Sequence, residues 1–295
     1  MHRQIIVLFL SLVFLALPSA WGADRGALFK VTAKGHTMYL FGTMHVGQPG
    51  FYPLEDTITG ALAKASTLAL EIDPLGDPAA LQAALQAHGM ATSANAQAAM
   101  PAPLRERLRR VLAKAGIDAV AVSRFKPWLV ATILAMGEYG AQGYRADLSV
   151  DMHLAQLARS NKVPVISLET PQLQMGLFSR LSDADQLSFL EESLTLIENG
   201  KQSEEVRQIV AAWGSADRAM FEQIAERAAK DTTVAGRFVK NVLLDERNVG
   251  LADKLARLLE KEVNTVAAIG VLHLVGGNSV PALLSARGAS VERIY

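Results

Sequence analysis

The sequence contains no cysteine, so it has no disulfide, no cysteine nucleophile and no lipid-modified N-terminal cysteine. A chain of this length can bury an ordinary hydrophobic core, and the lack of disulfides therefore does not argue against export. Charge is balanced as well, because 29 basic and 29 acidic residues give a formal net charge of 0. This balance predicts neither a nucleic-acid partner nor electrostatic capture by an anionic membrane.

Several catalytic signatures are also missing. The sequence has no Gly-x-Ser-x-Gly nucleophile elbow, no Walker phosphate loop, no Gly-x-Gly-x-x-Gly dinucleotide loop and no His-Glu-x-x-His zinc motif. Covalent acyl transfer, nucleotide binding and zincin chemistry therefore lack their usual sequence signals.

Long apolar runs are scarce, and the two that occur are too short to span a bilayer. Residues 128–136 are typical of a buried helix, whereas residues 5–17 have the length of a signal-peptide core and follow a short polar start. Small residues precede a plausible cleavage site at Gly22. We expect residues 1–22 to be a signal peptide cleaved near Gly22, and the mature chain, 23–295, to be periplasmic or secreted. Membrane contact is then expected only before cleavage; an uncleaved N-terminal anchor is the alternative.

The most informative feature that is present is a motif that occurs twice. Residues 39–47 are an apolar run that breaks into Gly-x-x-His at His45, and residues 266–276 repeat this design at His273. With 6 His and 22 Gly in the chain, chance alone gives about 0.4 such matches, so the shared context of the two copies matters more than the motif itself. A strand that ends in glycine and then presents histidine places an imidazole at the carboxyl edge of a sheet, where open α/β sheets bind ligands.

Two further predicted strands end in carboxylates. Residues 67–73 form an apolar run that ends with Glu71 and Asp73, and Glu169 directly follows the run 163–168. A carboxylate at the end of a buried strand is costly unless it is paired, coordinated to a metal or wetted in a cleft. Each glutamate could instead cap the helix that follows it.

These imidazoles and carboxylates together match a metal-ligand set. They suit Zn²⁺, Mn²⁺, Co²⁺ or Fe²⁺, and two His with one Glu around an open coordination position form a known metallohydrolase shell. His45, His273, Glu71 and Glu169 are therefore candidates, with one glutamate as ligand and the other as general base. Either histidine could instead be a core residue that is hydrogen-bonded to the backbone.

Arg247 and Asn248 lie at the start of a predicted helix that opens near Asp245. In a first helical turn they could bind an oxyanion or orient a carboxylate. For Arg247 the alternative is an ordinary ion pair with Asp245 or Glu246.

Three other histidines are predicted to lie on the surface. Asp151 and His153 are two residues apart on a predicted helix and point to different faces, so they do not form a ligand pair. We interpret Asp151 as an N-terminal helix residue and His153 as a surface residue. His36 lies beside a predicted turn, and His88 lies in an Ala- and Gln-rich stretch.

After an N-terminal β-hairpin around residues 34–35, predicted strands alternate with helices, which indicates an α/β class with a central sheet flanked by helices. Helical periodicity dominates the region between the two halves of the sheet. We expect a single domain over residues 23–295 with a helical segment, about residues 176–240, inserted between those halves.

Taken together, the motifs resemble those of the TraB/GumN family, which is related to the Tiki proteases. Order and spacing agree over nearly the whole mature chain, at residues 39–47, 52–54, 70–73, 163–170, 246–248, 268–276 and 281–288. The resemblance implies a mixed-sheet α/β fold. It also implies divalent-metal-dependent peptide hydrolysis carried by His45, His273 and Glu71, with Glu169, Arg247 and Asn248 as neighbours.

The leading hypothesis is therefore an exported metal-dependent hydrolase, a peptidase with a His/His/Glu site for Mn, Co or Zn. Glu71 would be a ligand or general base, Glu169 a ligand or a neighbour of the ligands, and Arg247 and Asn248 would position a peptide or other small substrate. The alternative is a non-catalytic periplasmic protein that binds a peptide, haem or another small ligand in the same cleft. The residues give no support to a role in envelope polysaccharide.

Overall fold

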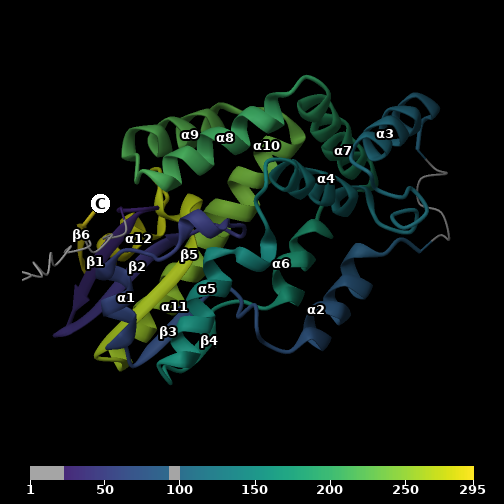
Figure 1. Cartoon of the computed structure of the whole chain (residues 1–295). Coiled ribbons are helices and arrows are strands. Elements are labelled where there is room, and N and C mark those ends of the chain that lie inside the picture. The colour runs from purple at the N-terminus through teal and green to yellow at the C-terminus, as the bar shows by residue number, and fades with distance from the viewer. Residues whose placement is uncertain (1–22, 93–99) are drawn as a thin grey trace, which may run out of the picture.

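A mixed sheet of six strands forms the centre of the computed structural model, which describes residues 23–92 and 100–295 (Figure 1). The predicted signal peptide, residues 1–22, lies outside the described residues. So do residues 93–99, which belong to the Ala- and Gln-rich stretch. Within the part of the chain that the structure describes, no helix is both long and apolar enough to cross a bilayer.

The strands run in the order β4-β3-β5-β2-β1-β6 across the sheet. Their bounds are β1 Leu28–Ala33, β2 His36–Thr43, β3 Thr67–Leu70, β4 Val165–Ser167, β5 Asn264–Gly270 and β6 Ser290–Arg293. Neighbours from β4 to β2 are parallel, whereas β1 is antiparallel to both β2 and β6. The predicted α/β class and mixed sheet are confirmed.

The N-terminal hairpin forms where it was predicted. Lys34 and Gly35 connect β1 to β2 with φ angles of 51° and 85°, a left-handed conformation that glycine adopts without steric cost. At the centre of the sheet, β3 is buried along its whole length, and β5 along most of it, which explains their continuous apolar sequences. The ladder of β3 ends at Leu70, so Glu71 already lies beyond the strand.

Helices cover the sheet on both faces. The crossovers from β2 to β3 and from β3 to β4 contain α1 (Asp56–Ala63) and α5 (Val150–Ser160), and the return from β4 to β5 contains α11 (Arg247–Lys261). Parallel crossovers are right-handed, so the reversal of direction along the sheet puts α11 on the face opposite α1 and α5. Helix α12 (Val280–Ala286) packs beside α11.

A second hydrophobic core lies in a helical layer beyond the sheet, visible in Figure 1 as the group of helices around α4 and α7. The layer comprises α3 (Ala102–Lys114), α4 (Pro127–Ala141), α7 (Asp183–Glu198), α8 (Lys201–Gly214), α9 (Arg218–Lys230), α10 (Val234–Phe238) and the π-helix η5 (Val239–Glu246). Of these, α8 and α9 bury their apolar side chains in the core of the sheet, and the other segments form the second core. This second core combines side chains such as Leu108, Leu134 and Leu190, so the layer is drawn from two separate stretches of chain.

Shorter segments connect the layers. They are η1 (Pro49–Phe51), α2 (Pro78–Ala84), the π-helix η2 (Leu85–Gly89), η4 (Ala146–Leu148), α6 (Pro171–Phe178) and the 3₁₀ turn η6 (Val271–Leu274). Helix α11 begins at Arg247 near the predicted position, but η5 leads directly into it. The N–H of Arg247 is already bonded to the carbonyl of Leu244, so Arg247 acts through its side chain.

Candidate functional site

Each of the four adjacent parallel strands is followed by one candidate residue. Glu169 follows β4, Glu71 follows β3, His273 follows β5 and His45 follows β2, which is their order across the sheet. Strand β5 returns between β3 and β2, and such a reversal of strand order is where open α/β sheets bind ligands. The four side chains from distant parts of the sequence thus share one edge of the sheet.

His45 is held by a carboxylate that sequence reasoning had assigned only to a helix start. Its Nδ1 lies 3.0 Å from Oδ2 of buried Asp151, in the first turn of α5. Asp151 also accepts a hydrogen bond of 2.7 Å from Oγ1 of Thr43. The Asp151 carboxylate raises the pKa of His45. Because Nδ1 is engaged, Nε2 is the ring nitrogen left to face the site.

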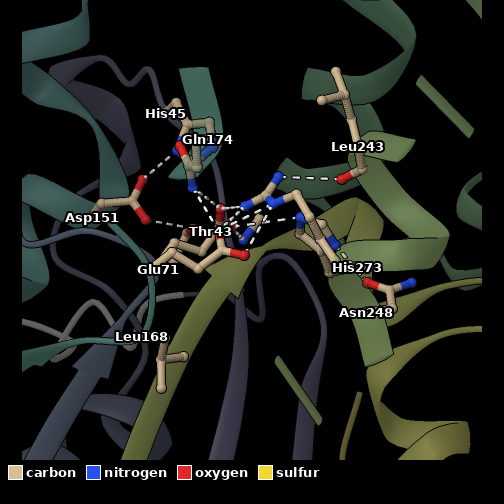
Figure 2. Close-up of polar contacts among 12 residues, drawn as sticks. Thr43, His45, Glu71, Asp151, Leu168, Gln174, Leu243, Asn248 and His273 are labelled. Carbon is tan, nitrogen blue, oxygen red and sulfur yellow. Dashed lines mark hydrogen bonds and ion pairs between the residues drawn. The ribbon is translucent and has the colours of Figure 1, made fainter. Parts of the chain in front are cut away.

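His273 is held by a neutral partner on the other side (Figure 2). Its Nδ1 lies 2.6 Å from Oδ1 of Asn248, whose Nδ2 donates to the carbonyl of Asn278 at 2.8 Å. The amide orientation requires Nδ1 of His273 to carry the proton, which leaves the lone pair on Nε2. Burial lowers the pKa of His273 to about 4, so the ring is neutral at pH 7.

Arg247 joins the two glutamates into a buried cluster. Its guanidinium forms ion pairs with Oε2 of Glu71 and, at 2.6 Å, with Oε2 of Glu169. The side-chain amide of Gln174 donates to both carboxylates, at 3.2 and 2.8 Å. The two glutamates are only 4% and 5% exposed, so burying their charges carries a desolvation cost. Pairing with the Arg247 guanidinium offsets part of this cost.

Glu71 is ionised despite this burial. Burial alone opposes its charge, but the His273 and His45 imidazoles, the Arg247 guanidinium and the Gly270 N–H outweigh burial and lower the pKa of Glu71 to about 2. The Gly270 N–H donates to Oε1 at 2.6 Å. Oε1 also lies 3.8 Å from Nε2 of His273, so a carboxylate oxygen and an imidazole lone pair face each other.

Glycine 270 makes this approach possible. A β carbon there would lie 3.1 Å from Oε1 of Glu71, 3.6 Å from Cδ2 of His273 and 3.7 Å from Nε2 of His45. Three candidate side chains therefore converge on the space above one glycine. In the other copy of the motif, a β carbon on Gly42 would lie 2.8 Å from Cγ2 of Val271. The glycine of each Gly-x-x-His motif thus permits a close approach.

The described residues contain no group of three or more His, Cys, Asp or Glu side chains already placed to hold a metal ion. The chemistry of the donors nevertheless fits one. Both imidazoles are oriented through Nδ1 by a second residue, which leaves Nε2 as the nitrogen that would coordinate, the usual arrangement of metal-binding histidines. Asp151 raises the pKa of His45 to about 9, so Nε2 of His45 would release a proton on binding a metal. Oε1 of Glu71 lies beside the same glycine, Gly270, as the two imidazoles. The side chain of His45 is 64% exposed, whereas those of His273 and Glu71 are each 5% exposed.

The structure brings together Glu71, Glu169, Arg247, Asn248 and His273, and it places His45 at their edge. Asn248 is 2% exposed and contacts Nδ1 of His273. Asp73, which also ends the β3 segment, turns away and forms an ion pair of 2.6 Å with Arg159.

Sequence reasoning missed three polar residues of the site: Thr43, Asp151 and Gln174. A helix-start aspartate and a mid-helix glutamine carry no local signal for this role. Of the histidines expected on the surface, His153 instead stacks on Tyr52 with ring centroids 4.0 Å apart.

A cavity of about 240 Å³ opens beside the cluster. It is lined by Thr43, Met44, His45, Val46, Met136, Tyr139, Ile209, Leu243, Leu244, Arg247, Gly270, Val271, Leu272 and His273. The charged and imidazole groups of the lining therefore lie at the strand ends and at Arg247, among apolar neighbours, whereas the helical layer contributes mainly apolar side chains.

Fold and site define an α/β protein with paired imidazoles and carboxylates at the carboxyl edge of a mixed sheet. The chain belongs to the TraB/PrgY/gumN family, because a sequence model of that family matches residues 27–293. This confirms the resemblance drawn from the motifs.

Among known proteins, the chain is similar to YbaP, described as uncharacterized, of Escherichia coli strain K12 and of Shigella flexneri. Each is 26% identical over 283 residues, which cover 90% of this chain and 96% of the relative. An uncharacterized protein of Treponema pallidum is 23% identical over 183 residues, covering 61% of this chain and 54% of the relative. No solved structure matches the chain.

Proposed function

We propose that this protein is an exported, divalent-metal-dependent hydrolase that acts on peptide bonds, with His45, His273 and Glu71 as the metal ligands. The main support is the orientation of the two imidazoles. Asp151 and Asn248 each engage an Nδ1. Nε2 of His273 lies 3.8 Å from Glu71 Oε1, and Nε2 of His45 lies 3.7 Å from the position that a β carbon on Gly270 would take. Nitrogen and carboxylate donors of this kind suit Zn, Mn or Co.

A bound divalent ion would supply the Lewis acidity that polarises a scissile carbonyl and acidifies a water molecule. The chain itself would supply proton transfer and charge. Glu169 lies within the cluster and would take a proton from the attacking water and return it to the leaving amine. Arg247 lines the cavity and would balance the negative charge that develops on the carbonyl oxygen. Asn248 would keep the neutral tautomer of His273 in place.

A second candidate is a non-catalytic binding protein that uses the same cleft. The observation that favours it is the ion pairing of Arg247 with both Glu71 and Glu169, which gives the two carboxylates a counter-charge from the chain itself. Such a protein would hold a peptide, haem or another small ligand and would not turn it over.

Metal content tests the proposal directly. The mature chain, residues 23–295, would be loaded with Mn²⁺, Co²⁺ or Zn²⁺, desalted and measured by elemental analysis. The site variant His45→Ala/His273→Ala would be compared with His36→Ala/His88→Ala, which removes the same number of imidazoles outside the cluster. We expect about one metal per chain in the unchanged protein and in the control, and none in a site variant that remains folded by circular dichroism.

Peptide hydrolysis is the second readout. We expect the loaded protein to cleave a mixture of peptides, chelation to abolish cleavage, and Glu169→Gln to retain the metal but lose turnover. Equal metal retention in the site variant and the control would contradict the ligand assignment. Metal or peptide binding without turnover would favour the binding protein, and a Soret band in the purified protein would identify haem.

A further inference from the structure

The cavity beside the cluster has two unlike walls. One wall carries the polar side chains His45, Arg247 and His273, together with apolar residues next to the two histidines in the chain (Met44, Val46, Val271 and Leu272). The helical layer forms the facing wall, with Met136 and Tyr139 from α4, Ile209 from α8, and Leu243 and Leu244 from η5. Residues from three helical segments, far apart in the sequence, thus gather opposite the imidazoles.

The facing wall carries no charged side chain among the described residues that line it. Met136 is 38% exposed, and Ile209, Leu243 and Leu244 are half-buried. Single apolar residues on a surface are ordinary, but several that line one hollow beside polar groups mark a ligand site. The wall is therefore built to meet an apolar group.

Size restricts that group. At about 240 Å³ the cavity is smaller than clefts that enclose a drug-sized ligand, which measure about 300–1,000 Å³. An apolar cavity of about 150 Å³ holds benzene. The space thus suits one large aliphatic or aromatic side chain rather than a whole ligand.

We infer that this cavity is a specificity subsite for a single large apolar side chain of the substrate peptide, next to the bond that is cleaved. The inference rests on the proposed hydrolase function. A side chain placed between Met136 and Ile209 would bring its own backbone against His45 and Arg247, because these residues line the same cavity. The helical layer would then select the substrate while the strand ends act on it.

The test uses the peptides acetyl-Ala-Ala-Xaa-Ala-Ala-amide, with Xaa as Gly, Ala, Leu, Phe or Asp, in binding and cleavage assays. Binding is measured by calorimetry on the metal-free mature chain, and cleavage by mass spectrometry on the loaded chain. We expect the Leu and Phe peptides to be preferred over the Gly peptide by at least about tenfold in both assays.

Met136→Glu places a charge on the apolar wall and is expected to reduce this preference by about tenfold. Leu81→Glu is the matched control, because Leu81 is 52% exposed on α2, outside the cavity, and the preference should be unchanged. Met136→Trp narrows the cavity without a charge and should disfavour the Phe peptide more than the Ala peptide. Circular dichroism checks that each variant is folded.

The outcomes separate this inference from the proposed function. Apolar preference in binding that Met136→Glu removes supports the subsite even if no peptide is cleaved, and the hydrolase proposal alone then fails. Cleavage of all five peptides at equal rates would contradict the subsite proposal but would still support the hydrolase proposal. Absence of binding at millimolar peptide, or a preference that both Met136 variants retain, also overturns the subsite.

Discussion

The pKa values of the two imidazoles of the site are shifted in opposite directions by their surroundings. Asp151 carries a charge and raises the pKa of His45, whereas Asn248 is neutral and burial lowers the pKa of His273 to about 4. The side chain of His45 is 64% exposed and that of His273 only 5%. A pair of titratable groups pushed apart in this way is typical of a catalytic site.

The low pKa of His273 makes acid destabilise the protein. A histidine whose pKa is lower in the folded chain stabilises it fully above the unfolded pKa of about 6.5, and this stabilisation is lost as the pH falls through about 4. Glu71, with a pKa of about 2, adds a further loss below its unfolded pKa of 4.5. Between pH 6.5 and 4 we expect the free energy of unfolding to fall by up to about 1.4 kcal/mol per pH unit from His273.

Urea unfolding of the metal-free chain at several pH values measures this slope. His273→Gln keeps an N–H donor for Asn248 but has no proton to gain, so its free energy of unfolding should depend less on pH in this window. Identical slopes for the two proteins would show that His273 does not titrate as proposed.

Trp213 is one of several residues through which α8 packs against the sheet, together with Val206 and Val210. It lies near the end of α8, is fully buried, and its Nε1 donates to the carbonyl of Gly42 in β2 at 2.8 Å. Its ring packs against Phe51 and Phe41, with centroids 4.8 and 6.5 Å away. The bonded carbonyl lies three residues before His45, so this contact links the helical layer to the site.

Trp213→Phe should therefore destabilise the protein and loosen this attachment. The variant leaves the buried Gly42 carbonyl without its partner, which costs about 1–3 kcal/mol, and it also removes ring volume. Urea unfolding measures the loss in the free energy of unfolding. Hydrogen exchange shows which backbone amides are affected, and we expect faster exchange for amides of β2 and α8. Trp128→Phe is the control, because Trp128 donates to His88 within the helical region. Equal exchange of β2 in both variants would contradict the assignment.

Local pattern predicted most elements and misplaced some of their ends. The hairpin turn at Lys34 and Gly35 follows from residue chemistry, and α11 from its period of apolar residues. The strand expected over residues 163–168 narrows to Val165–Ser167, an edge strand with one neighbour. Its length is decided by how far β3 pairs with it, which its own sequence does not specify.

At the scale of the whole molecule, the site lies where two hydrophobic cores meet. The strand ends supply the two imidazoles, and in the apolar wall Tyr139 and Ile209 pack against the sheet core while Leu243 packs against the helical core. Neither core alone forms the cavity. Substitutions in the helical layer are therefore expected to change ligand preference, and substitutions at the strand ends to change the chemistry.

Export is the remaining property of the whole chain. We propose that full-length protein made in a Gram-negative host reaches the periplasm and is cleaved near Gly22, because residues 5–17 match a signal-peptide core. Cell fractionation and mass measurement of the product test this, with a mature chain starting at Ala23 as the expected result. Leu10→Arg puts a charge into the apolar core and should keep the chain uncleaved. Uncleaved wild-type chain would contradict the proposal.

The sequence by itself determined which residues could do chemistry. His45, His273, Glu71 and Glu169 were identified because each follows an apolar run, and such a run indicates a strand and its end. A carboxylate at that position is costly to bury, which marks it as a candidate site residue. Arg247 and Asn248 were found as the start of a periodic helix. These features depend on neighbours within a few positions along the chain.

Only the tertiary structure decided how those residues act together. The return of β5 between β3 and β2 puts His273 between Glu71 and His45, and no short segment encodes that strand order. Asp151 meets His45 from 106 residues away, and Arg247 meets Glu71 from 176 residues away. A buried polar group needs a hydrogen-bond partner. Here the partners come from distant parts of the sequence, so the contacts form only when the helices and the sheet have packed together.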